Sequence, residues 1–96
     1  MKAADCTTME QVRAEIDRVD AALVALLAER TTYIDRASDL KPALGLPARI
    51  EDRVEEVVAK VRDRAEAEGF DPALAEALWR RLIDWSIARE EDVIGR

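Results

Sequence analysis

The fold is decided by residues 7–40, TTMEQVRAEIDRVDAALVALLAERTTYIDRASDL. A stripe of mostly apolar residues recurs along this stretch every three or four positions. Its members are Met9, Val12, Ile16, Val19, Leu23, Leu26, Arg30, Tyr33 and Ala37. This heptad-like spacing, with a single charged member, predicts one amphipathic helix of about 30 residues. We place its start near Thr7 or Thr8, with Thr7 and Glu10 forming a capping box. Its end is expected where Pro42 disfavours helix at the preceding residue.

The remainder of the sequence predicts two shorter helices, at about residues 48–68 and from Pro72 toward Ile94. Gly69 is a natural carboxyl-terminal stop for the first of them, and Asp71 is an N-cap placed directly before a proline. We expect their inner faces to carry Ile50, Val54, Val57, Val58 and Val61 in one helix and Leu74, Leu78, Leu82, Ile83 and Trp85 in the other. Residues 1–96 are therefore predicted to form one all-α domain of three helices, one long and two shorter.

The composition argues against several classes of protein. Among 96 residues, 49% are hydrophobic and 38% charged, with three Gly and three Pro, which disfavours both an all-β fold and disorder. Cys6 is the single cysteine and histidine is absent, so an internal disulfide, a zinc site and Cys–His or Ser–His catalysis are not expected. A net charge of −6 disfavours a broad nucleic-acid surface. Neither a membrane-length apolar run nor a leader is visible, so we expect a cytoplasmic protein.

The length of the first helix predicts a homodimer. About 30 helical residues extend roughly 45 Å, whereas a compact domain of this size has a radius of gyration of about 12 Å. Part of the helix must then extend past the core of its own chain while carrying an apolar stripe, which a second copy would cover. A kinked helix in a monomer is the alternative, but residues 7–40 contain neither Gly nor Pro. We therefore predict an intertwined homodimer.

Several charged residues fall on faces that should be buried. Arg30 lies on the stripe itself, Lys41 follows on the same bearing, and Arg13 lies at the edge of the stripe. A buried cation is costly without an anion, and the stripe carries no acidic residue, so a small anionic ligand is one candidate for the counter-charge. An internal salt bridge or an outward-pointing side chain is the competing interpretation. On the third helix, Ser86 and Glu90 continue the inner face one turn apart.

Arg53 lies beside Val54 near the inner face of the second helix. It could join this cationic group, and the competing interpretation is an exposed ion pair with one of the neighbouring glutamates, which are Glu51, Glu55 and Glu56. A pocket with several cations, one carboxyl group and no nucleophile suits a small dianionic or trianionic ligand. It also suits a reaction promoted by shape and charge stabilisation without covalent catalysis.

Five parts of the chain form a pattern that can be compared with known families: residues 12–20 (VRAEIDRVD), 26–30 (LLAER), Lys41, 47–53 (PARIEDR) and 82–87 (LIDWSI). Together they resemble the all-α chorismate mutases, whose members are intertwined dimers of three-helix chains. The similarity covers essentially the whole chain. It implies a Claisen rearrangement of chorismate to prephenate that needs no cofactor.

Carried over to this sequence, the resemblance implies a role for each matching residue. Arg30 would bind one substrate carboxylate, and Arg13, contributed by the partner subunit, would bind the other. Lys41 would donate to the ether oxygen and the nearby carboxylate. Arg53 would support the cationic wall, and Ser86 would help to line the pocket. The transition state gains negative charge at the ether oxygen, so a fixed cation there lowers the barrier.

Two features depart from the mutase pattern. Acidic residues are common in the family where this chain has Ile50 and Val54, and the apolar pair, together with residues 5–7 (DCT), resembles the related isochorismate-pyruvate lyases. Val54→Glu is therefore expected to improve turnover of chorismate by restoring a partner for its ring hydroxyl. Glu90 stands where bacterial relatives usually have Gln, so a protonated Glu90 would donate to the ether oxygen and an ionised one would repel it.

We predict a chorismate mutase-type enzyme without a cofactor, and the alternative is an isochorismate-pyruvate lyase that yields salicylate and pyruvate. The candidate catalytic residues are Arg13, Arg30, Lys41 and Glu90, and the candidate substrate-binding residues are Ile50, Arg53, Val54 and Ser86. A non-catalytic helical dimer that acts in interaction or regulation is a further alternative. Nucleic-acid binding through Arg80 and Arg81 is disfavoured because acidic residues surround them.

Overall fold

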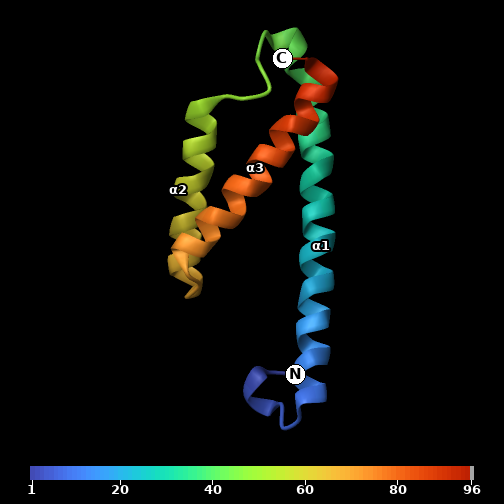
Figure 1. Ribbon diagram of the computed structural model, residues 1–96, viewed down its shortest axis with the longest axis vertical. Coiled ribbons are helices and arrows are strands. Elements are labelled where there is room, and N and C mark those ends of the chain that lie inside the picture. Colours follow the sequence, from blue (N-terminus) through green and yellow to red (C-terminus); the bar gives the residue numbers. More distant parts are fainter. Residues whose placement is uncertain (96) are drawn as a thin grey trace. The chain divides into compact units, whose positions relative to one another are not determined.

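The structure, a computed structural model, describes residues 1–95, and the regular elements in this range are all helical (Figure 1). The elements are η1 (Ala3–Asp5), α1 (Met9–Leu40), η2 (Pro42–Leu44), α2 (Glu51–Glu68) and α3 (Pro72–Ile94). The predicted all-α class, with one long and two shorter helices, is confirmed. No helix in the described part of the chain combines the length and apolar character needed to cross a membrane. The chain divides into two compact units, Met1–Tyr33 and Ile34–Arg96.

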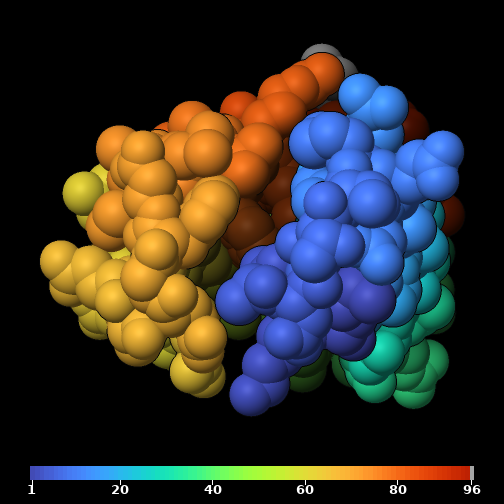
Figure 2. Space-filling model, turned by 90° about the horizontal axis from the view of Figure 1, so that it is seen from below, coloured from blue at the N-terminus to red at the C-terminus, as the bar shows by residue number. Residues whose placement is uncertain are grey.

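The amino-terminal segment of the first unit caps α1. Thr8 Oγ1 accepts a hydrogen bond from the Gln11 amide at 3.1 Å, and Gln11 Oε1 accepts from the amides of Thr8 at 3.1 Å and Thr7 at 2.7 Å. The predicted capping box of Thr7 and Glu10 is therefore wrong by one residue, because the helix begins at Met9 and Gln11 becomes its third residue. Figure 2 shows this segment in dark blue against the lighter blue start of α1.

The apolar stripe of α1 is uncovered along much of the first unit. Its exposed members are Met9, Ile16, Val19, Leu23, Leu26 and Tyr33. Val12, near the start of the helix, is half-buried. A helix that presents an apolar stripe of this length to solvent has the features of an interaction surface.

The second unit has a small core between α2 and α3, which pack against each other (Figure 1). Its buried members are Ala48, Val54, Val58, Ile83 and Ile87, with Val57, Trp79 and Ile94 packed against them. Figure 2 shows the end of α2 and the start of α3, in yellow and orange, as one continuous surface. The core therefore fixes α3 on α2 and also holds the loop residue that precedes α2.

The boundaries of α2 follow from local backbone geometry. The helix begins at Glu51, three residues later than predicted, because Ile50 has extended angles (φ −123°, ψ 103°) and serves as the N-cap. The Ile50 carbonyl accepts the Val54 amide at 3.1 Å. At the other end Gly69 adopts a left-handed conformation (φ 73°), which glycine tolerates without steric cost, and the predicted stop is confirmed.

The start of α3 is as predicted, but its buried face is not. Asp71 Oδ1 accepts hydrogen bonds from the second and third residues of the helix at 2.9 and 3.3 Å. The buried residues of α3 are Ala75, Ile83, Ser86, Ile87 and Glu90, whereas Leu74, Leu78 and Trp85 are exposed. The predicted inner face is thus wrong for these three. Two apolar stripes run about 100° apart along this helix, and packing on α2 buries the one that begins at Ala75.

Candidate active site

Lys41 directly follows α1 and connects three parts of the second unit. Its backbone keeps helical angles (φ −58°, ψ −42°), and its amide donates to the Ala37 carbonyl at 2.9 Å. The side chain is 17% exposed, and Nζ lies 2.8 Å from the Ala48 carbonyl oxygen and 2.8 Å from Glu90 Oε1. The end of α1, the loop before α2 and the last turns of α3 therefore meet at one ammonium group.

Glu90 is buried on α3, with 4% of its surface exposed. It continues the inner face of the helix, as the sequence predicts. Lys41 Nζ approaches Oε1 out of line for a hydrogen bond, so this buried oxygen accepts no hydrogen bond from residues 1–95. Buried carboxylate oxygens usually have donors, and here the opposite charge of Lys41 offsets the burial.

Ser86 lies one turn before Glu90 on the same face of α3 and is also buried. Its hydroxyl donates to the Leu82 carbonyl at 2.8 Å, within its own helix. The structure thus brings Lys41 and Glu90 into contact and places Ser86 in line with Glu90.

The contact with Glu90 decides between the two interpretations of Lys41. The apolar stripe that leads to Lys41 carries no acidic residue, and this absence favours a ligand as the anion that balances Lys41. In the structure the anion is the carboxylate of Glu90. The counter-charge of Lys41 is therefore a carboxylate of the chain itself, as the competing interpretation of an internal salt bridge predicts. Helical spacing describes one helix at a time, whereas this partner comes from α3.

The Ala48 carbonyl that binds Lys41 is held by the residues around it. Ala48 itself is buried in the core. The next residue, Arg49, contacts Asp84 of α3 at 2.8 Å and Glu51 at 3.3 Å. The hydrogen bond to Asp84, and more weakly that to Glu51, raises the pKa of Arg49. The sequence could not indicate that Ala48 accepts a hydrogen bond from Lys41, because the acceptor is a backbone carbonyl and every residue has one.

The two apolar positions that resemble the lyases have different surroundings. Ile50 is half-buried at the N-cap of α2. Val54 is 8% exposed and belongs to the core with Val58 and Ile87. A glutamate at position 54 would bring a charge into this core at a cost of several kcal/mol, about 3 or more. The expected benefit of Val54→Glu therefore does not follow from this structure.

The three predicted arginines have separate environments. Arg53 is exposed, and its Nη1 lies 2.6 Å from Glu56 Oε1. This geometry matches the competing interpretation of an exposed ion pair. Arg13, which is exposed, and Arg30, which is half-buried, belong to the first unit.

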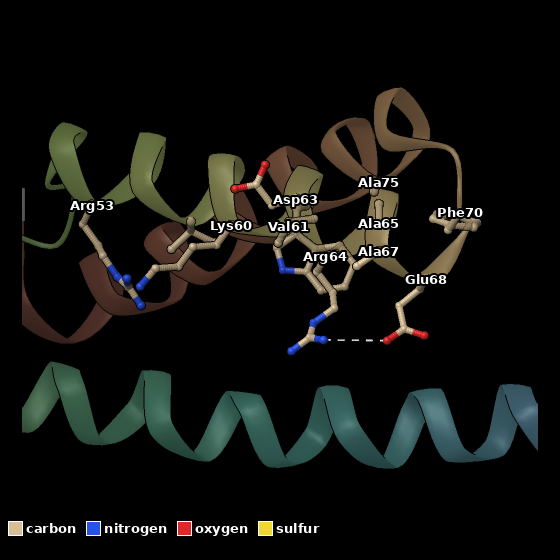
Figure 3. A pocket seen from close by; sticks show the side chains of 12 residues that line it. Arg53, Lys60, Val61, Asp63, Arg64, Ala65, Ala67, Glu68, Phe70 and Ala75 are labelled. Carbon is tan, nitrogen blue, oxygen red and sulfur yellow. Dashed lines mark ion pairs between the residues drawn. The ribbon is translucent and has the colours of Figure 1, made fainter.

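A cavity of about 750 Å³ lies between α2 and the start of α3 (Figure 3). Its apolar lining includes Val57, Val61, Ala65, Phe70 and Trp79. Figure 3 shows Arg53, Lys60 and Arg64 projecting from α2 along one side of it, where Arg64 lies 3.7 Å from Glu68. Among the eight predicted site residues, Arg53 is the one that lines this cavity. The contact of Lys41 with Glu90 is therefore a separate feature of the second unit.

An ion pair that the sequence did not reveal lies next to Glu90. Arg89 Nε lies 2.6 Å from Asp35 Oδ1 and its Nη2 lies 3.0 Å from Asp35 Oδ2. The Arg89 guanidinium also lies 5.6 Å from the centre of the Trp85 ring. Its hydrogen bonds hold the pKa of Asp35 below the usual range. In the sequence, only the position of Arg89 beside Glu90 on the predicted inner face could have drawn attention to it.

The sequence is also similar to a known protein family and to two characterised proteins. The profile of the family described as chorismate mutase type II matches residues 12–91. The T-protein of Enterobacter agglomerans is 37% identical over 81 residues, which cover 84% of this chain and 22% of the T-protein. The isochorismate pyruvate lyase of Pseudomonas aeruginosa is 33% identical over 87 residues, which cover 90% of this chain and 84% of that enzyme. The predicted resemblance is confirmed: the chain belongs to the chorismate mutase type II family.

Proposed function

We propose that this chain is an enzyme that rearranges chorismate to prephenate. The observation that carries the proposal is the family match over residues 12–91, a range that includes all eight predicted site residues. The structure supports it with a half-buried lysine, Lys41, that is held by Ala48 and Glu90. The T-protein extends far beyond this chain, which spans 22% of its length, so the proposal concerns the matched region alone.

The rearrangement is a single pericyclic step in which the ether C–O bond breaks as a C–C bond forms. It transfers no proton, needs no nucleophile and involves no redox change, so the protein has to orient the substrate and stabilise charge. Lys41 Nζ has three N–H donors, of which one is donated to the Ala48 carbonyl, while Glu90 lies 2.8 Å away as an ion pair. A remaining N–H is the donor that we assign to the ether oxygen, which gains negative charge in the transition state.

The remaining cations are assigned to the carboxylates of the substrate. Arg30 would bind one carboxylate, and Arg13 from a second copy of the chain would bind the other. The exposed apolar stripe of α1 supports an intertwined homodimer, because pairing two copies would cover it. Arg53 and Ser86 would complete the wall of the pocket. A cytoplasmic location remains part of this proposal.

Elimination of pyruvate from isochorismate, which leaves salicylate, is the second candidate reaction. The isochorismate pyruvate lyase of Pseudomonas aeruginosa matches over 84% of its own length, far more than the T-protein does. The apolar pair Ile50 and Val54 supports the same candidate.

The deciding experiment is to incubate the purified protein separately with chorismate and with isochorismate and to identify the products. We expect prephenate from chorismate; salicylate and pyruvate from isochorismate would favour the second candidate. Lys41→Met should lower kcat about 100-fold or more, because it removes the donor at the developing charge.

Arg30→Ala separates an enzyme from a non-catalytic dimer. An enzyme loses turnover while the dimer stays intact, whereas a non-catalytic module keeps its ligand binding and keeps or gains stability. Arg36→Ala is the matched control, because Arg36 is an exposed arginine of the same helix that pairs with Asp39 at 3.8 Å. Absence of turnover of both substrates by the wild type would refute the proposal.

A further inference from the structure

We propose that Asp35 and Arg89 are positioning residues that set the register of α3 against the end of α1 and so place Glu90 beside Lys41. The kinetic consequences of this inference rest on the proposed function, but the positioning itself does not.

The geometry of the Asp35–Arg89 pair is directional. Two parallel contacts of 2.6 and 3.0 Å join the guanidinium to both carboxylate oxygens, an arrangement that fixes orientation as well as distance. Trp85, one turn earlier on α3, lies under the guanidinium at 5.6 Å and restricts its rotation. Arg89 is therefore held from two sides, although the pair is partly exposed.

The two ion pairs at this point have opposite polarity. In one pair, α1 provides the carboxylate of Asp35 and α3 the guanidinium of Arg89. In the other, Lys41 after α1 provides the ammonium and Glu90 of α3 the carboxylate. Arg89 and Glu90 are adjacent in the sequence. Adjacent residues of a helix point about 100° apart. Rotation of α3 by that angle in one sense would bring Arg89 toward Lys41, and rotation in the other sense would bring Glu90 toward Asp35, so either rotation would break both ion pairs and create one repulsive contact. The observed register is thus the one that satisfies both pairs.

The apolar contacts of α3 alone cannot distinguish the observed register of this helix from a rotated one. Ile87 belongs to the core and Ile94 packs against it, but burial of apolar surface is non-directional. The two ion pairs supply the orientation that these contacts lack. Asp35 and Arg89 thereby act on the chemistry through Glu90 and Lys41, without touching substrate.

The test uses a neutralised pair and an inverted pair in the full chain. Asp35→Asn removes one charge at nearly constant volume, and Asp39→Asn is the matched control on the same helix, where Asp39 pairs with Arg36. The double variant Asp35→Arg with Arg89→Asp restores attraction between these positions. It also makes both wrong registers attractive, because the new aspartate at position 89 would face Lys41 after rotation in one sense and Glu90 would face the new arginine at position 35 after rotation in the other.

We expect Asp35→Asn to lower kcat on chorismate about tenfold with KM within about twofold, because Glu90 and Lys41 act in the transition state. Asp39→Asn should leave both constants unchanged. The inverted pair should recover the Tm of the wild type while kcat stays low. If the inverted pair recovered the full kcat, the pair would only hold α3 against α1 without selecting its register, and the inference would be overturned.

A second measurement does not depend on turnover. The coupling between Lys41→Met and Glu90→Gln is measured by urea unfolding, first in the wild-type background and then in the Asp35→Asn background. We expect a coupling of about tenfold in the unfolding equilibrium constant in the first background and a value close to one in the second. An equal coupling in both backgrounds refutes the positioning role, even if the protein proves inactive on both substrates.

Discussion

At the residue scale, Lys41 and Glu90 place a half-buried ammonium 2.8 Å from a buried carboxylate. In the proposed reaction this carboxylate has two opposing effects. It holds Lys41 in place, and its negative charge weakens the stabilisation that Lys41 can give to the ether oxygen. A neutral side chain of the same shape would keep the first effect and remove the second.

We therefore expect Glu90→Gln to raise kcat on chorismate about tenfold at about pH 7. The measurement is the kcat of both proteins on chorismate at about pH 7. Glu91→Gln, at the neighbouring half-buried position, is the control. An unchanged or lower kcat in Glu90→Gln would contradict the weakening effect assigned to the charge of Glu90.

Val54 illustrates how burial changes the expected result of a substitution. Val54→Glu should lower the free energy of unfolding by about 3 kcal/mol or more, because it buries a carboxylate among apolar side chains. Val54→Ala should cost about 2 kcal/mol by leaving a cavity. Val93→Glu, at a position 67% exposed, should change stability by less than about 0.5 kcal/mol. Urea unfolding of the three variants checks these values, and a stable, more active Val54→Glu would contradict this placement of Val54.

At the element scale, ion pairs join α2 to α3 along an exposed edge. Arg62 Nη1 and Arg80 Nε each lie 2.6 Å from a carboxylate oxygen of Glu76, and Arg80 Nη2 lies 3.1 Å from Glu55 Oε2. Hydrogen bonds from Arg80, and then from Arg62, hold the pKa of Glu76 below its usual 4.5. Hydrogen bonds to Glu55 and Glu76 raise the pKa of Arg80. One carboxylate thus links arginines from both helices.

The stability that Glu76 contributes should depend on pH in a defined direction. Because its pKa is lower in the folded state, the contribution is complete above the usual value of 4.5 and is lost as the pH falls through the lower folded value. We expect Glu76→Gln to lower Tm by about 2 °C at about pH 7 and to have no effect near about pH 2. Glu66→Gln on α2 is the control, since Glu66 forms no ion pair within residues 1–95. A difference in Tm that is independent of pH would contradict the assignment.

At the scale of the whole molecule, the exposed stripe of α1 should determine the oligomeric state. Leu23→Asp places a charge at the centre of this stripe and should convert the proposed dimer to monomer, with loss of turnover because Arg13 and Arg30 then no longer meet. Ala21→Asp is the matched control, because Ala21 lies about 160° away around the helix. Sedimentation equilibrium and activity measured at equal protein concentration test both variants. A wild type that stays monomeric at about 0.1 mM would exclude the dimer proposal.

The sequence by itself determined the helices and most of their ends, because these depend on neighbours within about one turn. Gly69 ended α2 and Asp71 began α3 through their own backbone and side-chain chemistry, whereas α1 ended at Leu40 as expected although Lys41, before Pro42, keeps helical angles. The capping residue of α1 was misplaced by one position because Glu10 and Gln11 can each act in a capping box. The buried position of Glu90 also followed from spacing.

Only the tertiary structure decided which charges meet and which apolar stripe is buried. The partner of Lys41 comes from α3, Arg53 turns to Glu56, and Val54 enters the core. α3 carries two apolar stripes that satisfy helical periodicity equally well, and its contact with α2 selects one of them. These outcomes depend on distances between residues far apart in the chain, which periodicity along one helix does not contain.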